Sequence, residues 1–140
     1  VTGNFDIKVQ VTNITAAGTY PQAGLMARTD LSTGAMDVAI TASSTYVSPG
    51  SYRFKYRNAP GAATTQTQGG GQASFPNTWV RLTRVGNVFT TYASSNGTTW
   101  TQIGTVTLST APPTMLVGMV AASNVTTSTT TSSFRNFSGL

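Results

Sequence analysis

The chain has 140 residues, of which 8% are charged, with eight Lys and Arg against three Asp and without Cys, His or Glu. These absences exclude thiolate and imidazole chemistry, the usual ligands of zinc, haem and iron–sulfur sites, and a catalytic triad. A glycosidase needs two positioned carboxyl groups, and no motif brings Asp6, Asp30 and Asp37 together, so we do not expect an enzyme.

The length suits one domain, covering residues 1–140. The 27 Thr, 14 Ser and 14 Gly beside so few charges are typical of a secreted or cell-surface bacterial protein, and we expect a monomeric domain excised from a larger extracellular chain. No run approaches the roughly 20 apolar residues of a membrane helix. The net charge of +5 includes only two Lys and no dense basic run, so we expect no nucleic-acid partner.

Alternation of apolar and polar residues predicts strands along the whole chain and no helix. The predicted strands are Phe5–Thr12, Ala23–Thr29, Met36–Thr41, Ser51–Arg57, Thr78–Val85, Val88–Ser94, Thr99–Ile103, Met115–Ser123 and Thr131–Ser138. About nine strands joined by short turns, without crossover helices, predict an all-β antiparallel two-sheet β-sandwich. The long stretch Asn58–Asn77 is predicted to be irregular, and loops of that length are usually functional or mobile.

Two dipeptides, Gly86-Asn87 and Asn96-Gly97, predict tight hairpin turns. The first turn pairs Thr78–Val85 with Val88–Ser94 and places the uncharged side chains Val80, Leu82, Phe89 and Ala93 on the core face. Arg84 falls on the same face but next to the turn, where its charged end is expected to reach water.

The second turn places Trp100 opposite Ala93, and therefore in the core. With the same counting Ile103 falls on the outer face, unless a β-bulge shifts the register between the two strands.

The opposite face of this meander carries Trp79, Arg81 and Tyr92. In the preceding strand Tyr52, Phe54 and Tyr56 alternate with Arg53, Lys55 and Arg57. If the two strands are neighbours, the predicted site is one face formed by Arg53, Arg57, Trp79, Arg81 and Tyr92. Aromatic rings stack on sugar rings and Arg binds hydroxyl or carboxylate groups, although each of these residues is also common in a purely structural role.

Other candidates are weaker. The loop aromatics Tyr20, Tyr46 and Phe75 either rim a pocket or cover the ends of the sandwich. Oxygen ligands for a structural calcium are available on Asp6, Asp37 and Asn136, but no Asp-x-Asp spacing accompanies them and calcium needs six or more oxygens. We therefore predict no metal and no cofactor.

Four segments, in order along the chain, resemble a concanavalin A-like (LamG-like) jelly-roll family of secreted bacterial proteins. They are Ala23–Arg28, Trp79–Asn87, Ser94–Gly104 and Val117–Ser123, and Phe134–Phe137 is similar to the closing strand of that family. The resemblance implies a jelly roll with one convex and one concave sheet, attached to a catalytic or surface domain of the parent protein. It defines no universal ligand.

The function we expect is that of a lectin-like, non-catalytic carbohydrate-binding module. Its partner would be a polysaccharide held on a sheet face or cleft lined by aromatic and Arg side chains. The cationic lining favours a uronic-acid or sulfated glycan over a neutral β-glucan. The alternative is a structural or adhesion domain of a surface protein without a soluble ligand.

Overall fold

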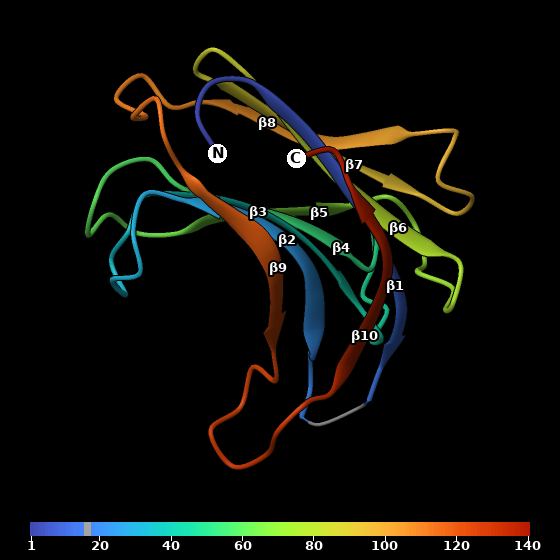
Figure 1. The fold of residues 1–140 in the computed structure, drawn as a ribbon. Helices are drawn as coiled ribbons and strands as arrows, with labels where there is room; N and C mark the ends of the chain where they lie inside the picture. Colours follow the sequence, from blue (N-terminus) through green and yellow to red (C-terminus); the bar gives the residue numbers. More distant parts are fainter. Residues whose placement is uncertain (16–17) are drawn as a thin grey trace.

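The computed structural model describes residues 1–15 and 18–140 and consists of two stacked antiparallel sheets (Figure 1). The strands are β1 (Phe5–Ile14), β2 (Gln22–Arg28), β3 (Asp37–Ser43), β4 (Tyr52–Arg57), β5 (Thr65–Gly69), β6 (Thr78–Val85), β7 (Val88–Ser94), β8 (Thr101–Thr107), β9 (Leu116–Ala122) and β10 (Ser132–Ser138). The first sheet has the order β10-β1-β6-β7-β8, and the second has the order β5-β4-β3-β2-β9. The predicted all-β sandwich is confirmed. Within the described ranges no helix is long and apolar enough to span a membrane.

The core lies between the two sheets and follows the alternation of the sequence. From Phe5 to Val11 in β1 every second side chain is buried, and the intervening ones face outward. The largest fully buried side chains come from both sheets and include Ile7, Leu82 and Phe89 from the first and Leu25 and Ile40 from the second. Burying each such side chain contributes about 1.5–3 kcal/mol, so the strands hold together chiefly through this shared layer.

One strand was missed by the sequence prediction. Residues Thr65–Gly69 form β5, an edge strand paired with β4, inside the stretch that we predicted to be irregular. Its sequence, TQTQG, contains no apolar residue, so it gives no hydrophobic alternation to recognise.

The Gly86-Asn87 hairpin has the predicted register, with Val85 opposite Val88 and Arg81 opposite Tyr92. Its predicted core side chains are buried. The expectation for Arg84 was wrong, because this residue is only 4% exposed and donates to the carbonyl oxygens of Gly86, Pro112 and Pro113. Its guanidinium carbon also lies over an aromatic ring, 5.2 Å from the ring centre of Phe89.

The second turn is longer than a two-residue hairpin. The Asn96 side-chain oxygen accepts from the backbone N–H groups of Thr98 and Thr99, so the turn extends to Trp100 before β8 begins. Thr101, rather than Trp100, therefore lies opposite Ala93. A shift of one residue moves a side chain to the other face of a sheet. The predicted core position of Trp100 is thus wrong, and its ring lies over Arg81 on the outer face.

A β-bulge is also present at Ile103. The register shifts between Thr91 and Tyr92, which pair with Gly104 and Gln102, so Ile103 is the extra residue of β8. The longer turn already brings the side chain of Ile103 to the core face, where it packs, and the bulge keeps Gly104 and Val106 opposite Thr91 and Phe89.

Candidate functional site

The five residues of the predicted site lie on two opposite faces of the sandwich. Arg53 and Arg57 belong to β4 of the second sheet, whereas Trp79, Arg81 and Tyr92 belong to β6 and β7 of the first. The assumption that β4 and β6 are neighbours was wrong, because β4 pairs with β3 and β5. Tyr52 and Phe54 do face the core, as predicted, but they do so from the second sheet. The shared face is therefore corrected to two separate clusters.

The cluster on the first sheet is internally satisfied. Arg81 donates to both carboxylate oxygens of Asp6, from Nε at 2.7 Å and also from Nη2. Its guanidinium carbon lies 5.2 Å from the ring centre of Tyr92 and 5.6 Å from that of Trp100. The charge and the flat faces of Arg81 are thus occupied by neighbouring side chains. Trp79 is half-buried, with the backbone of Gly97 against its ring.

Two arginines of the second sheet, Arg28 on β2 and Arg57 on β4, brace loops through main-chain carbonyl oxygens. Arg57 donates to the carbonyl oxygens of Ala62, Thr33 and Ala35, and one of its nitrogens lies 3.6 Å from the carboxylate of Asp37. Its donors are therefore committed to holding neighbouring chain segments, which is a structural role.

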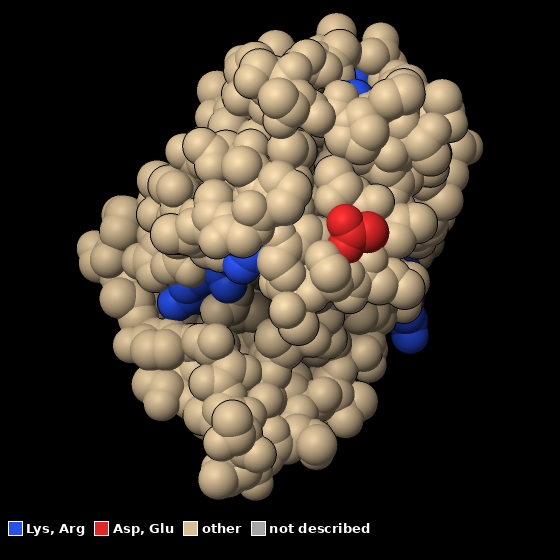
Figure 2. Space-filling model, turned by 90° about the vertical axis from the view of Figure 1, so that its left-hand side faces the viewer, with Lys and Arg blue, Asp and Glu red and all other residues tan. Residues whose placement is uncertain are grey.

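The remaining cations of this sheet, Arg53 and Lys55, lie in a hollow on its outer face. The cationic hollow, as we call it, has a volume of about 300 Å³ and is lined by Tyr20, Gln22, Val47, Arg53, Lys55, Gln66, Gln68 and Asn124. Figure 2 shows Lys and Arg atoms recessed in a hollow of the molecular surface. The lining contains two cations, five residues with an amide or hydroxyl group, and no carboxylate.

Arg53 is unusually placed for a charged residue. It is 3% exposed, and its Nη1 atom is buried without a hydrogen-bond partner among the described residues. Its guanidinium lies over the ring of Tyr20, 5.1 Å from the ring centre. A buried charged donor without a partner costs free energy, which an acceptor bound in the hollow would recover.

Lys55 is oriented by a short polar network. Its Nζ atom donates to the side-chain oxygen of Gln22 at 2.5 Å, and the same oxygen accepts from the hydroxyl of Thr41 at 2.9 Å. The partner of the ammonium group is thus a neutral amide. The network fixes the Lys55 side chain without neutralising its charge.

Electrostatics in the hollow are dominated by burial. Burial, and then the charge of Arg53, lower the pKa of Lys55, while Asp37 acts in the opposite direction. Burial likewise lowers the pKa of Arg53. For Asp37 burial raises the pKa, against the lowering effect of Arg57. A bound anion would therefore favour the charged form of Lys55 and compensate for the burial of the Arg53 charge.

Of the residues that line the cationic hollow, Arg53 alone belongs to the site predicted from the sequence. Lys55 lies in the same alternation as Arg53 and could have been included on that signal. Gln66 and Gln68 of β5 could not have been assigned to the site, because that strand was not predicted. Of the loop aromatics, Tyr20 lines the cationic hollow, Phe75 packs against the core, and Tyr46 is 48% exposed.

The candidate calcium ligands are not brought together. Asp6 is bound to Arg81 on the first sheet, Asp37 lies beside Arg57 on the second, and Asn136 donates to the side chain of Gln10. Across residues 1–15 and 18–140, no group of three or more Asp, Glu, His or Cys side chains has the proximity that a metal ion needs.

Comparisons with known proteins identify the family and the fold. The model of a family described as protein of unknown function (DUF1349) matches residues 1–139. A functionally unknown protein from Saccharomyces cerevisiae is 20% identical, with a TM-score of 0.70 over 100% of this chain and 70% of that one. A mutant of the GH43 protein BlXynB from Bacillus licheniformis is 14% identical, with a TM-score of 0.67 over 94% of this chain and 26% of that one. No curated protein matches the chain.

Proposed function

The chain belongs to the DUF1349 family, and for this member we propose a carbohydrate-binding function without catalysis, at the cationic hollow of the second sheet. The ligand would be an anionic glycan, with carboxylate or sulfate groups. The observation that carries the proposal is the pair Arg53 and Lys55, which are recessed together with no carboxylate among the lining residues.

Each part of the hollow has a role in this proposal. Arg53 and Lys55 bind the anionic group, because charge-assisted hydrogen bonds are the strong ones in a partly desolvated site. The amides of Gln66, Gln68 and Asn124 supply donors and acceptors for sugar hydroxyls. The resemblance to concanavalin A-like domains of secreted bacterial proteins supports the same proposal, including an extracellular parent protein in which the module accompanies another domain.

The first experiment is affinity electrophoresis, followed by calorimetry, against neutral, uronic-acid and sulfated polysaccharides. Retardation by an anionic class, weakened as salt screens the charges, is the expected result. A shallow hollow of this size predicts modest affinity. If no polysaccharide of the panel retards the protein, the alternative of a structural or adhesion domain replaces this proposal.

A matched pair of variants locates the site. Lys55→Gln should weaken binding by about 1.5–3 kcal/mol, a factor of about 10 to 150, because a charged hydrogen bond is lost. Lys8→Gln removes the same charge from the other sheet, where Lys8 lines a hollow beside Asp6 and Arg81. It should leave the affinity unchanged. Equal losses in both variants would mean that net charge, and not this hollow, governs binding.

A further inference from the structure

A second hollow lies on the same face of the second sheet, beside the cationic one. The strand registers place Lys55 opposite Ala39, Ala39 opposite Met26, and Met26 opposite Gly118. Neighbouring strands are about 4.8 Å apart, so the backbones at Lys55 and Met26 are separated by about 10 Å. One small molecule can therefore touch both positions.

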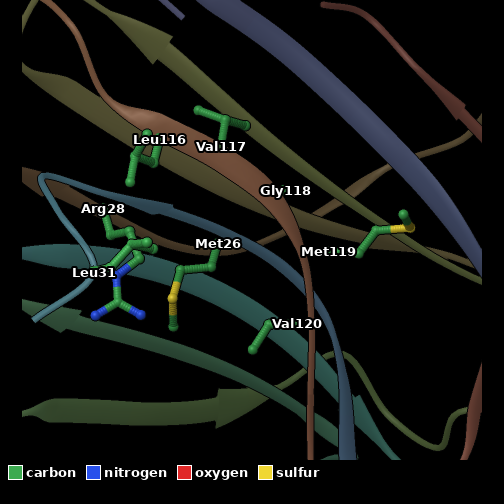
Figure 3. Close-up of a pocket in the computed structure, with 8 residues that line it drawn as sticks. All are labelled: Met26, Arg28, Leu31, Leu116, Val117, Gly118, Met119 and Val120. Carbon is green, nitrogen blue, oxygen red and sulfur yellow. The ribbon is translucent and has the colours of Figure 1, made fainter. Parts of the chain in front are cut away.

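This apolar hollow, as we call it, has a volume of about 280 Å³ and is lined by Met26, Arg28, Leu31, Leu116, Val117, Gly118, Met119 and Val120 (Figure 3). Two of its apolar side chains are open to solvent, with Leu31 81% exposed and Leu116 46%. The side chains of Val117 and Met119 alternate to the other face of β9 (Figure 3). Gly118 leaves open space above its backbone. Exposed apolar side chains gathered around one hollow make it a candidate binding surface.

The one charged residue of the apolar hollow is already committed. Arg28 donates to the carbonyl oxygens of Asp30 and Ser32, so it braces the loop that carries Leu31. The surface that this hollow offers to a ligand is therefore apolar, in contrast to the polar lining around Lys55.

We propose that the glycan bound by this face carries an apolar acyl or alkyl substituent about 10 Å from its anionic group, and that the apolar hollow holds this substituent. The inference rests on the proposed function. Its basis is the position of the two hollows on one face of the second sheet, with the charge of Lys55 over β4 and the apolar side chains of Met26 and Leu116 over β2 and β9.

Three simple probes separate the contributions in calorimetry: methyl β-D-glucuronide, hexyl β-D-glucuronide and hexyl β-D-glucoside. The hexyl glucuronide should bind at least about tenfold more tightly than the methyl glucuronide, because its chain leaves water. Met26→Gln and Leu116→Gln should abolish that gain and leave the affinity for methyl glucuronide unchanged. Val88→Gln, at a 43% exposed valine of the first sheet, is the matched control and should change neither.

The remaining outcomes separate this inference from the proposed function. If the hexyl chain adds no affinity, or if its gain survives both apolar-hollow variants, the inference is overturned, while binding that depends on Lys55 upholds the proposed function. Equal affinity for hexyl glucoside and hexyl glucuronide would overturn the anionic ligand. If no probe binds and sedimentation shows a dimer that Leu116→Gln dissociates, the apolar hollow is a contact between two copies, and both proposals fail.

Discussion

The indole ring of Trp79 lies against the backbone of Gly97. A Cβ atom added to Gly97 would approach Cε2 of the indole to 2.9 Å, and the residue has a positive φ of 72°. Trp79 is the second residue of β6, and Gly97 lies in the turn between β7 and β8, so the contact fastens this turn onto the first sheet. The ring of Trp79 therefore has a structural partner.

Gly97→Ala should lower the free energy of unfolding by about 1–3 kcal/mol, because it adds a contact with the indole to a strained backbone conformation. Urea unfolding measures the change. Gly61→Ala is the matched control, with a φ of 74° and no atom near the added Cβ. It carries the same backbone strain without the contact, so equal losses in the two variants would contradict a role for Trp79.

Asp6→Asn should cost no more than about 1 kcal/mol at neutral pH, since the ion pair with Arg81 is partly exposed. The hydrogen bond from Arg81 lowers the pKa of Asp6 below its ordinary value of 3.8. The stabilisation is therefore present above that value and is lost as the pH falls through the lowered pKa. Unfolding free energies of the two proteins should converge in acid; a gap that stays constant would contradict the ion pair as its cause.

Lys55→Arg should extend the binding of an anionic glycan to higher pH. In the native protein burial lowers the pKa of Lys55 below its ordinary value of 10.5. As the pH rises toward that value, the ammonium group loses its proton and the cationic hollow loses part of its charge. An arginine stays charged across the same range. Calorimetric titrations at increasing pH should show affinity falling in the native protein and persisting in the variant. If the affinity falls in parallel with rising pH in both proteins, the group whose titration weakens binding is not Lys55.

Gly104→Ala should be among the most destabilising single substitutions. An added Cβ would lie 2.1 Å from Cδ1 of Phe54, which belongs to the opposite sheet. Overfilling a close-packed core costs about 1–3 kcal/mol and sometimes more. Thermal unfolding should show a lower Tm, and the double variant Gly104→Ala/Phe54→Leu should recover part of it. No recovery would mean that the contact with Phe54 is not the cause.

Most strands could be predicted because core-lining strands such as β1 and β6 repeat their apolar residues with a period of two. The Gly86-Asn87 hairpin was predicted to the residue, since its turn fixes the register of both strands. The position of Trp100 was predicted wrongly, because the side-chain oxygen of Asn96 accepts hydrogen bonds from the backbone N–H groups of Thr98 and Thr99 and lengthens the turn. Such side-chain bonds change the count between strands, and the sequence alone does not reveal them.

The candidate site could be predicted only in part. The alternation of β4 correctly separated Arg53 and Lys55 from the core aromatics. Which strand lies beside β4 depends on contacts between distant parts of the chain, and the intervening strand β5 carries no apolar signal. The predicted site therefore joined residues whose side chains point to opposite sides of the molecule.

Arginine side chains fasten several loops of this protein through main-chain carbonyl oxygens. Arg28 binds those of Asp30 and Ser32, Arg57 those of Thr33, Ala35 and Ala62, and Arg84 those of Gly86, Pro112 and Pro113. Every residue has a main-chain carbonyl oxygen, so these attachments do not depend on which side chains the loops carry. The side chains of these loops, including Leu31 of the apolar hollow, can thus change while the loops keep their attachment. Substitution at Leu31 would therefore alter the lining of the proposed site without releasing the loop that carries it.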